Sequence, residues 1–230
     1  MPSPNIIKTY VDNSYYHIYN RGVEKRVIFH DDQDYKTFLS YLNFYLTIPL
    51  RGETPKSFPS QQLHNHTQEI KLLAYCIMPN HFHFFVRQND RHTINHFMRS
   101  IATRYGMYFN KRYKRVGSLF QGPYKASYID NEMQYLYLSK YIHRNPLDLP
   151  GYEKSSKLRE YPYSSYRNYL GFIHQDWVHP QEIKEYFSKE NHHTPYQQFV
   201  EDDQISEEIS TLKNMTLHHD TKRRNPKHRK

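Results

Sequence analysis

Two short apolar runs joined by a two-residue turn constrain the fold of this chain more than any other feature. IKLLAYCIM spans 70–78, HFHFFVR spans 81–87, and Pro79-Asn80 separates them. Apolar runs of this length, bounded by turn residues, are typical of buried strands, whereas a helix usually needs more residues. The pattern predicts a hairpin in the middle of a sheet.

Helical periodicity lies on both sides of this hairpin. Residues 31–46 carry apolar side chains at helical spacing after acids that suit a helix N-terminus, and residues 94–113 show the same spacing. A third helix is predicted from 131 to about 144, because Asp130 can cap its start and Asn145-Pro146 can end it.

Two further strands complete the predicted sheet. Residues 15–23 are β-branched and aromatic, and residues 117–129 form a strand or strand pair interrupted by Gly122-Pro123. The resulting order is strand, helix, paired strands, helix, strand, helix. This order predicts an α+β fold, a ferredoxin-like sandwich in which an antiparallel sheet carries helices packed mainly on one face.

The length of 230 residues suits one domain with an appendage. We expect the domain at 1–171 and a C-terminal helical appendage at 172–215, with short helices at 182–187 and 195–204. Residues 216–230 are expected to form a basic, disordered tail.

Positive charge is concentrated in two segments. The formal net charge is +9, and residues 91–115 hold seven Lys/Arg without any acid. The last nine residues hold six Lys/Arg, also without an acid. Because the rest of the chain is net acidic, we expect 91–115 to form a face for a polyanion such as nucleic acid. For the tail, a merely solvated charge run is an equal alternative.

Composition excludes several classes of protein. The mean hydropathy is −0.96 and no run approaches the roughly 20 apolar residues of a membrane-spanning helix. The start, Met1-Pro2-Ser3-Pro4-Asn5, does not resemble a signal peptide. A single cysteine excludes internal disulfides and cysteine-cluster metal sites. We therefore expect a cytoplasmic protein.

His81 and His83 are the first candidates for a functional site. On a strand, residues i and i+2 share a face, so the two imidazoles point the same way and could share one metal ion. The alternative is that they are ordinary polar-face histidines in a chain with 16 of them. The sequence lacks His-Glu-x-x-His and the Pro-Cys-x-x-Cys of zinc deaminases, so those two metal sites are excluded.

Tyr141 and Asn145 form the second candidate pair, at the end of the third predicted helix. Their i, i+4 spacing places them on one helix face, one turn apart. On composition alone, Tyr141 could equally be a core aromatic beside the apolar stripe of Tyr135, Leu138 and Ile142, since the chain has 23 tyrosines.

Three motifs in this order and spacing resemble the single-tyrosine transposases of the HUH nuclease superfamily. They are MPNHFHFFV (78–86), INHFMRSIATRYGMYFNKRYKRVGSLFQG (94–122) and KYIHRNP (140–146). The chain most resembles the REP-associated tyrosine transposases, an IS200-like group, from about Tyr15 to Gly171. One departure is Gly122-Pro123-Tyr124-Lys125, where the family usually has an arginine in place of Pro123.

The resemblance implies a role for each candidate residue. Tyr141 would be the nucleophile, His81, His83 and Asn145 would hold Mg²⁺ or Mn²⁺, and zinc would suit the imidazoles equally. The candidate contacts to DNA are all basic: Arg21, Arg99, Arg104, Lys111, Arg112, Lys114, Arg115 and Lys125.

The implied activity is cleavage and rejoining of single-stranded DNA beside a hairpin or palindromic repeat, through a 5′-phosphotyrosine and without ATP. The protein would be nucleoid-associated and either a monomer or a homodimer. Two alternatives remain at this point. One is a domesticated protein that binds structured nucleic acid without cutting it, and the other is a metal-dependent hydrolase of a small substrate.

Overall fold

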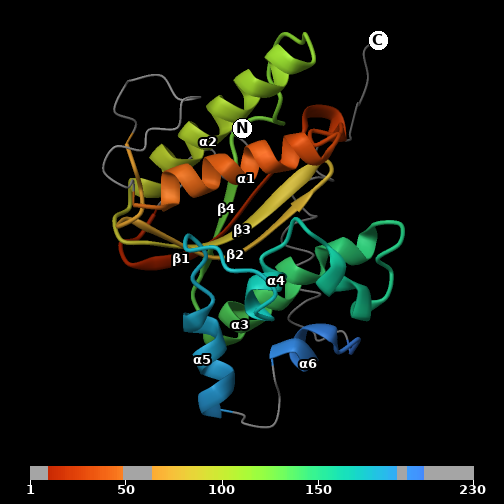
Figure 1. Cartoon of the computed structure of the whole chain (residues 1–230). Helices are drawn as coiled ribbons and strands as arrows, with labels where there is room; N and C mark the ends of the chain where they lie inside the picture. Colours follow the sequence, from red (N-terminus) through yellow and green to blue (C-terminus); the bar gives the residue numbers. More distant parts are fainter. Residues whose placement is uncertain (1–9, 49–63, 191–195, 205–230) are drawn as a thin grey trace, which may run out of the picture.

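A four-stranded antiparallel sheet lies at the centre of the computed structural model, which describes residues 10–48, 64–190 and 196–204 (Figure 1). Its spatial order is β2-β3-β1-β4 and every neighbouring pair is antiparallel. The strands are β1 (Ser14–Arg21), β2 (Ile70–Met78), β3 (His81–Gln88) and β4 (Lys125–Ile129). With one helix after β1 and another after β3, this is the ferredoxin-like arrangement, as predicted.

The predicted hairpin is confirmed, but it forms one side of the sheet rather than its middle, because β2 is an edge strand. Met78 pairs with His81 across the Pro79-Asn80 turn. The segment after β1 fastens this turn, because the backbone N–H groups of Ile28 and Phe29 both donate to the Pro79 carbonyl, at 2.8 and 3.0 Å. Gly22 allows the close approach, since a Cβ there would collide with the Arg26 carbonyl oxygen.

Two long helices cover one face of the sheet, above it in Figure 1. They are α1 (Asp32–Leu46) and α2 (Thr93–Arg112). Asp31 caps α1 by accepting a hydrogen bond from the Asp34 N–H, as its acidic N-terminus led us to expect. Phe38 of α1 and Phe97 of α2 pack with Phe82 and Phe84 of β3 in one buried cluster.

The opposite face is also covered, below the sheet in Figure 1. Here α3 (Glu132–Arg144) packs with the C-terminal elements, which are α4 (Tyr166–Tyr169), α5 (Gln181–Glu190), α6 (Tyr196–Glu201) and the 3₁₀ turns Asn145–Asp148 and Ser155–Glu160. The α+β class and the antiparallel sheet are confirmed. The helices are divided between both faces rather than gathered mainly on one, because β2 and β3 are buried on both faces.

The main departure from the predicted elements concerns 117–129. Only Lys125–Ile129 is a strand, and Gly117 and Gly122 take φ values of +91° and +94° in the loop before it.

Ile183 and Val200, from the C-terminal segment, pack in the same cluster as Leu138 of α3. The boundary between a domain at 1–171 and an appendage at 172–215 stays a prediction, and the basic tail lies outside the described residues.

In the part of the chain that the structure describes, no helix is both long and apolar enough to cross a membrane.

A buried carboxylate joins α1 to α2. Asp34 is fully buried and accepts hydrogen bonds from the His30 backbone N–H, the hydroxyls of Tyr108 and Tyr113, and the Arg112 guanidinium, at 2.6 to 2.9 Å. If the carboxylate were removed, the His30 N–H and the hydroxyls of Tyr108 and Tyr113 would lose this acceptor, whereas Arg112 would keep Asp31.

We therefore expect Asp34→Ala to lower the free energy of unfolding by about 3 kcal/mol, since a buried donor left without a partner costs about 1–3 kcal/mol. Urea denaturation of both proteins measures this. Lys36→Ala, which breaks the exposed Lys36–Asp32 pair on the same helix, is the control and should leave the midpoint nearly unchanged. Equal midpoints for Asp34→Ala and the wild type would contradict the assignment.

Candidate metal and nucleophile site

His81 and His83 begin β3 and point to the face covered by α3. Their ring centroids are 5.0 Å apart in an edge-to-face arrangement, so the predicted common orientation is confirmed. Phe82 and Phe84 point to the other face and are fully buried. His83 is 2% exposed, whereas His81 is half-buried at the end of the strand.

A third histidine, which the sequence analysis did not single out, comes from β1. His17 stacks on His83, with His17 Nε2 2.9 Å from His83 Nδ1. Burial lowers the pKa of His17 to about 3, and burial together with His81 and His17 holds the pKa of His83 well below its usual range. Both rings are therefore neutral at pH 7. Alternation along β1, which puts His17 on the same face as Tyr15 and Tyr19, was the signal that could have found it.

The Nδ1 atoms of the histidine pair both have partners. His81 Nδ1 lies 2.6 Å from Asn80 Oδ1, which can only accept, so Nδ1–H is the donor. His83 Nδ1 can likewise donate to His17 Nε2. In that tautomer, Nε2 is the ring atom that carries the lone pair, as is usual in metal-binding histidines.

Tyr141 reaches this pair from the helical layer. It lies in the last turns of α3 and is 7% exposed. Its ring stands edge-to-face against His83 at 5.5 Å and against His17 at 5.7 Å, measured between ring centroids. The structure therefore brings together Tyr141 and His83, which are 58 positions apart in the sequence.

Asn145 follows one turn after Tyr141 and is also buried. Its Nδ2 donates to the Tyr141 carbonyl at 2.9 Å and contacts the Ile142 carbonyl at 3.4 Å. The side chain thus provides a hydrogen-bond donor for carbonyl groups in the last turn of α3. With Nδ2 held by the helix, Oδ1 is the atom that Asn145 can offer to a ligand. Two imidazole nitrogens and one amide oxygen form a donor set that fits a divalent metal ion.

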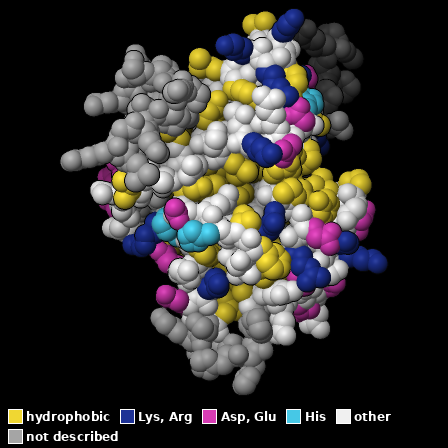
Figure 2. All heavy atoms as spheres, in the orientation of Figure 1, with side chains coloured by type: hydrophobic (Ala, Val, Ile, Leu, Met, Phe, Trp, Pro, Cys, Tyr) yellow, Lys and Arg dark blue, Asp and Glu magenta, His cyan; other side chains and the backbone are white. Residues whose placement is uncertain are grey.

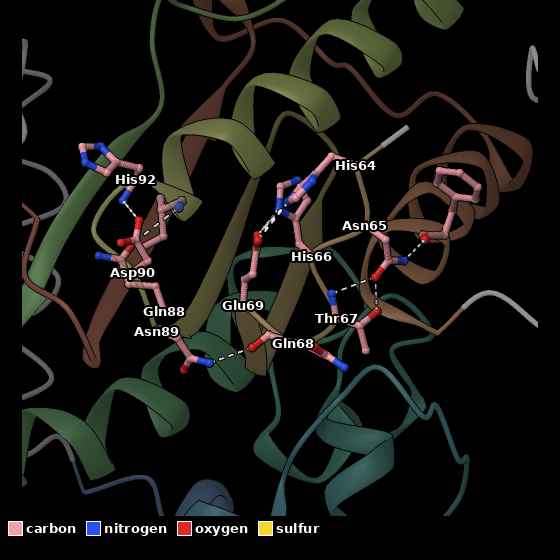
Figure 3. A network of polar contacts seen from close by, with 12 residues as sticks. His64, Asn65, His66, Thr67, Gln68, Glu69, Gln88, Asn89, Asp90 and His92 are labelled. Atoms are coloured by element: carbon pink, nitrogen blue, oxygen red, sulfur yellow. Dashed lines mark hydrogen bonds and ion pairs between the residues drawn. The ribbon is translucent and has the colours of Figure 1, made fainter. Parts of the chain in front are cut away.

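A separate group of side chains could also hold a metal ion. His64, His66 and Glu69 each offer a ligand atom, and all of these atoms lie within 4.8 Å of one another (Figure 3). The three residues lie just before β2, so the length of β2, roughly 27 Å, separates them from the hairpin turn and His81. The sequence analysis did not single out this group.

The basic residues of α2 differ in their surroundings. Arg112 bonds to Asp31 and Asp34 of α1, and Arg91 bonds to Asp12, so the segment without acids in sequence meets acids in space. Arg104 lies over the rings of Tyr41, Phe44 and Tyr45. The exposed members of the predicted set on or just after this helix are Arg99, Lys111 and Lys114. On the face drawn in Figure 2, Lys and Arg side chains likewise lie among Asp and Glu.

Arg21 and Lys125 lie beside the histidines instead. In the antiparallel register Arg21 is opposite His81 and Lys125 is opposite Tyr19, which is itself opposite His83. Residues directly opposite each other share a face of the sheet. Arg21 also donates to Gln121 Oε1 at 3.0 Å, and the Lys125 ammonium lies 5.7 Å from the Tyr19 ring centroid.

A groove of about 700 Å³ runs between α2 and the 117–124 loop. Asn95, Arg99 and Asn110 line it from α2, and Gly122, Pro123 and Tyr124 line it from the loop. Pro123, the departure from the family pattern, is exposed at this groove. Asn20 of β1 also lines it, which places one end of the groove near the end of β1 that pairs with His81 and Phe82.

Comparisons with known proteins agree with the resemblance seen in the sequence. Residues 59–145 match the family model described as "Transposase IS200 like". A solved REP-associated tyrosine transposase bound to a REP hairpin is 14% identical, with a TM-score of 0.52 over 76% of this chain and 92% of that chain. At this identity, the structural likeness shows a shared fold alone.

A presumed transposase of Deinococcus radiodurans R1 is 15% identical, over 63% of this chain and 97% of that chain, at a TM-score of 0.35 that carries no argument. No curated protein matches the chain. The segment that matches the IS200-like transposase model contains His81, His83, Tyr141 and Asn145.

Proposed function

We propose that the protein is a transposase that cuts and rejoins single-stranded DNA, with Tyr141 as its nucleophile. The observation that carries the proposal is the contact of the Tyr141 ring with His83, because it joins a nucleophile from one layer to a metal-binding pair from another. The family match over 59–145 supports the same reading.

The reaction requires one bond to form and one to break at phosphorus. The Tyr141 phenolate oxygen attacks the phosphate, the bond to the 3′ oxygen breaks, and the products are a 5′-phosphotyrosine and a free 3′-hydroxyl. Rejoining is the reverse reaction with a 3′-hydroxyl as nucleophile, so the phosphotyrosine conserves the bond and no ATP is consumed.

His81, His83 and Asn145 would hold Mg²⁺ or Mn²⁺ beside this tyrosine. When bound, the ion supplies positive charge to the non-bridging oxygens of the phosphate. His17 and Asn80 would fix the rings of His83 and His81 so that Nε2 of each faces the ion.

The substrate is inferred from charge and from the fold. The solved relative in the comparison is bound to a REP hairpin. In this chain, Arg21 and Lys125 lie on the face of the histidine pair, and the α2 groove with Arg99 opens near the same end of β1. We infer that a hairpin-flanking single strand runs from this groove to the histidine pair, and that the protein acts at the nucleoid in the cytoplasm.

Replacing the nucleophile is the first test. We expect Tyr141→Phe to abolish cleavage of a labelled single-stranded hairpin substrate in Mn²⁺, because the phenyl ring keeps the contact with His83 but lacks the attacking oxygen. Denaturing gels measure cleavage, and the covalent protein–DNA product should disappear with it. Tyr137→Phe, one turn earlier on α3 where the ring packs on Phe199, is the matched control.

Cleavage by Tyr141→Phe at the wild-type rate would remove Tyr141 from this role. If the wild type binds the hairpin but never cuts it with any divalent ion, the protein is a binding module and the proposal fails.

A second test concerns His17. We expect His17→Phe to weaken Mn²⁺ binding by about 10–100-fold, because the variant keeps the stacked ring but removes the acceptor for His83 Nδ1–H. His17→Gln retains an acceptor and should keep most of the affinity. Titration calorimetry without DNA measures both. Equal affinities in the two variants would show that the hydrogen bond does not position His83.

A third test concerns the basic face. We expect Lys111→Gln with Lys114→Gln to reduce the slope of log affinity against log salt by about 1.4, since each phosphate contact to a single strand contributes about 0.7. Lys36→Gln with Lys157→Gln removes the same charge from exposed sites elsewhere and is the matched control. Identical slopes in the two double variants would exclude a specific role for the α2 face.

A further inference from the structure

The cluster of His64, His66 and Glu69 lies outside the site described above. Glu69 Oε2 is 2.9 Å from His64 Nε2 and 3.0 Å from His66 Nδ1, so one carboxylate contacts two imidazoles (Figure 3). His66 is fully buried, while the side chains of His64 and Glu69 are 61% and 38% exposed. The cluster is therefore open to solvent on one side and enclosed on the other.

The backbone of this cluster is held in place without any ion. The Asn65 carboxamide nitrogen donates to the carbonyls of Phe44 and Thr47, at 3.0 and 2.7 Å, and so ties the segment to the end of α1. Asn65 Oδ1 accepts from the Thr67 backbone N–H at 2.9 Å and also from the Thr67 hydroxyl. Because the turn is already fixed, little conformational entropy would be lost when an ion binds.

His66 is unusual for a side chain that only supports the fold. Its ring packs against Tyr45 and Phe97, with centroids 6.1 and 5.7 Å away, and its Nε2 has no hydrogen-bond partner within the described residues. Its other nitrogen, Nδ1, is directed at the Glu69 carboxylate. Nδ1, and not the orphaned Nε2, is therefore the atom that His66 offers to a ligand beside Glu69.

We propose that His64, His66 and Glu69 form a second metal site, which takes a Zn²⁺-like ion. Two imidazole nitrogens and one carboxylate oxygen are a three-residue set that zinc prefers, and they leave the fourth position for water or a further ligand. Zinc–ligand bonds of about 2.0–2.2 Å fit between donor atoms that are already close together. His96 of α2 is close enough to His66 to interact with it electrostatically and is a candidate for the fourth position.

The role of this ion follows from its position. The site joins the segment before β2 to the end of α1, and through His96 it would reach α2. The Glu69 backbone carbonyl accepts a hydrogen bond from the Asn89 backbone N–H at 2.9 Å. Asn89 directly follows β3, so the site lies at the opposite end of this strand from His81. The ion therefore stabilises the layer that carries the α2 groove and takes no part in phosphate chemistry.

Zinc binding by the full-length protein in a His81→Ala/His83→Ala background tests the proposal. This background removes the first metal site, so the result does not depend on the proposed function. We expect one Zn²⁺ per chain in competition with a chromophoric chelator, and loss of that ion when His64→Ala and Glu69→Gln are added. Bound Co²⁺ should give the visible absorption of a tetrahedral site, which should be lost in the same variants.

Adding His92→Ala instead is the matched control, since this exposed histidine lies close by but outside the cluster. A comparison of variants is needed because the chain has 16 histidines that can bind zinc weakly. Equal zinc binding with and without His64 and Glu69 would overturn the proposal.

A second measurement covers the case in which the combined variant does not fold. Glu69→Gln alone, in the otherwise unchanged chain, alters one half-exposed side chain. Zn²⁺ should raise the Tm of the wild type and of His92→Ala by more than it raises that of Glu69→Gln. The same rise in all three proteins would show that the carboxylate binds no ion.

Discussion

Burial of β2 and β3 on both faces is the constraint on which the rest of the structure depends. Almost every side chain of the two strands is buried, so each face of the sheet needs its own cover. α1 and α2 supply one layer and α3 supplies the other. The second layer is what carries Tyr141 to His83, and a sheet covered on one face alone would leave the histidine pair without this partner.

The polar site is compatible with this burial because its groups satisfy one another. His83 and His17 are neutral and hydrogen-bonded, and the Asn145 amide nitrogen is held by helix carbonyls. A buried polar group costs free energy unless it has a partner, so these hydrogen bonds keep the side chains of the candidate site fixed. The Asp34 network does the same for the α1–α2 layer.

Strand and helix periodicity predict most elements of this fold and the faces on which the candidate residues lie. The resemblance to the single-tyrosine transposases, and not periodicity, is what selects His81, His83, Tyr141 and Asn145 from the other histidines, tyrosines and asparagines. The sequence does not reveal His17 as the partner of His83, since that contact depends on the β1–β3 register. It also does not reveal that Asp31 and Asp34 compensate Arg112, or that Glu69 meets His64 and His66. These contacts depend on how the chain turns between elements, which local periodicity does not specify.

Position in the fold changes which basic residues are the better candidates for contact with DNA under the proposed function. The sequence draws attention to the cluster after Arg104, yet Arg112 is bonded to two carboxylates and the helix covers the face of the sheet away from Tyr141. Arg21, an isolated residue in the sequence, lies opposite His81 on the face of the histidine pair. A phosphate that reaches Tyr141 must pass the half-buried His81, because His83 and Tyr141 are nearly enclosed. Under the proposed function, Arg21 would therefore lie beside the path of the scissile phosphate, and the exposed residues of α2 would meet the strand farther away.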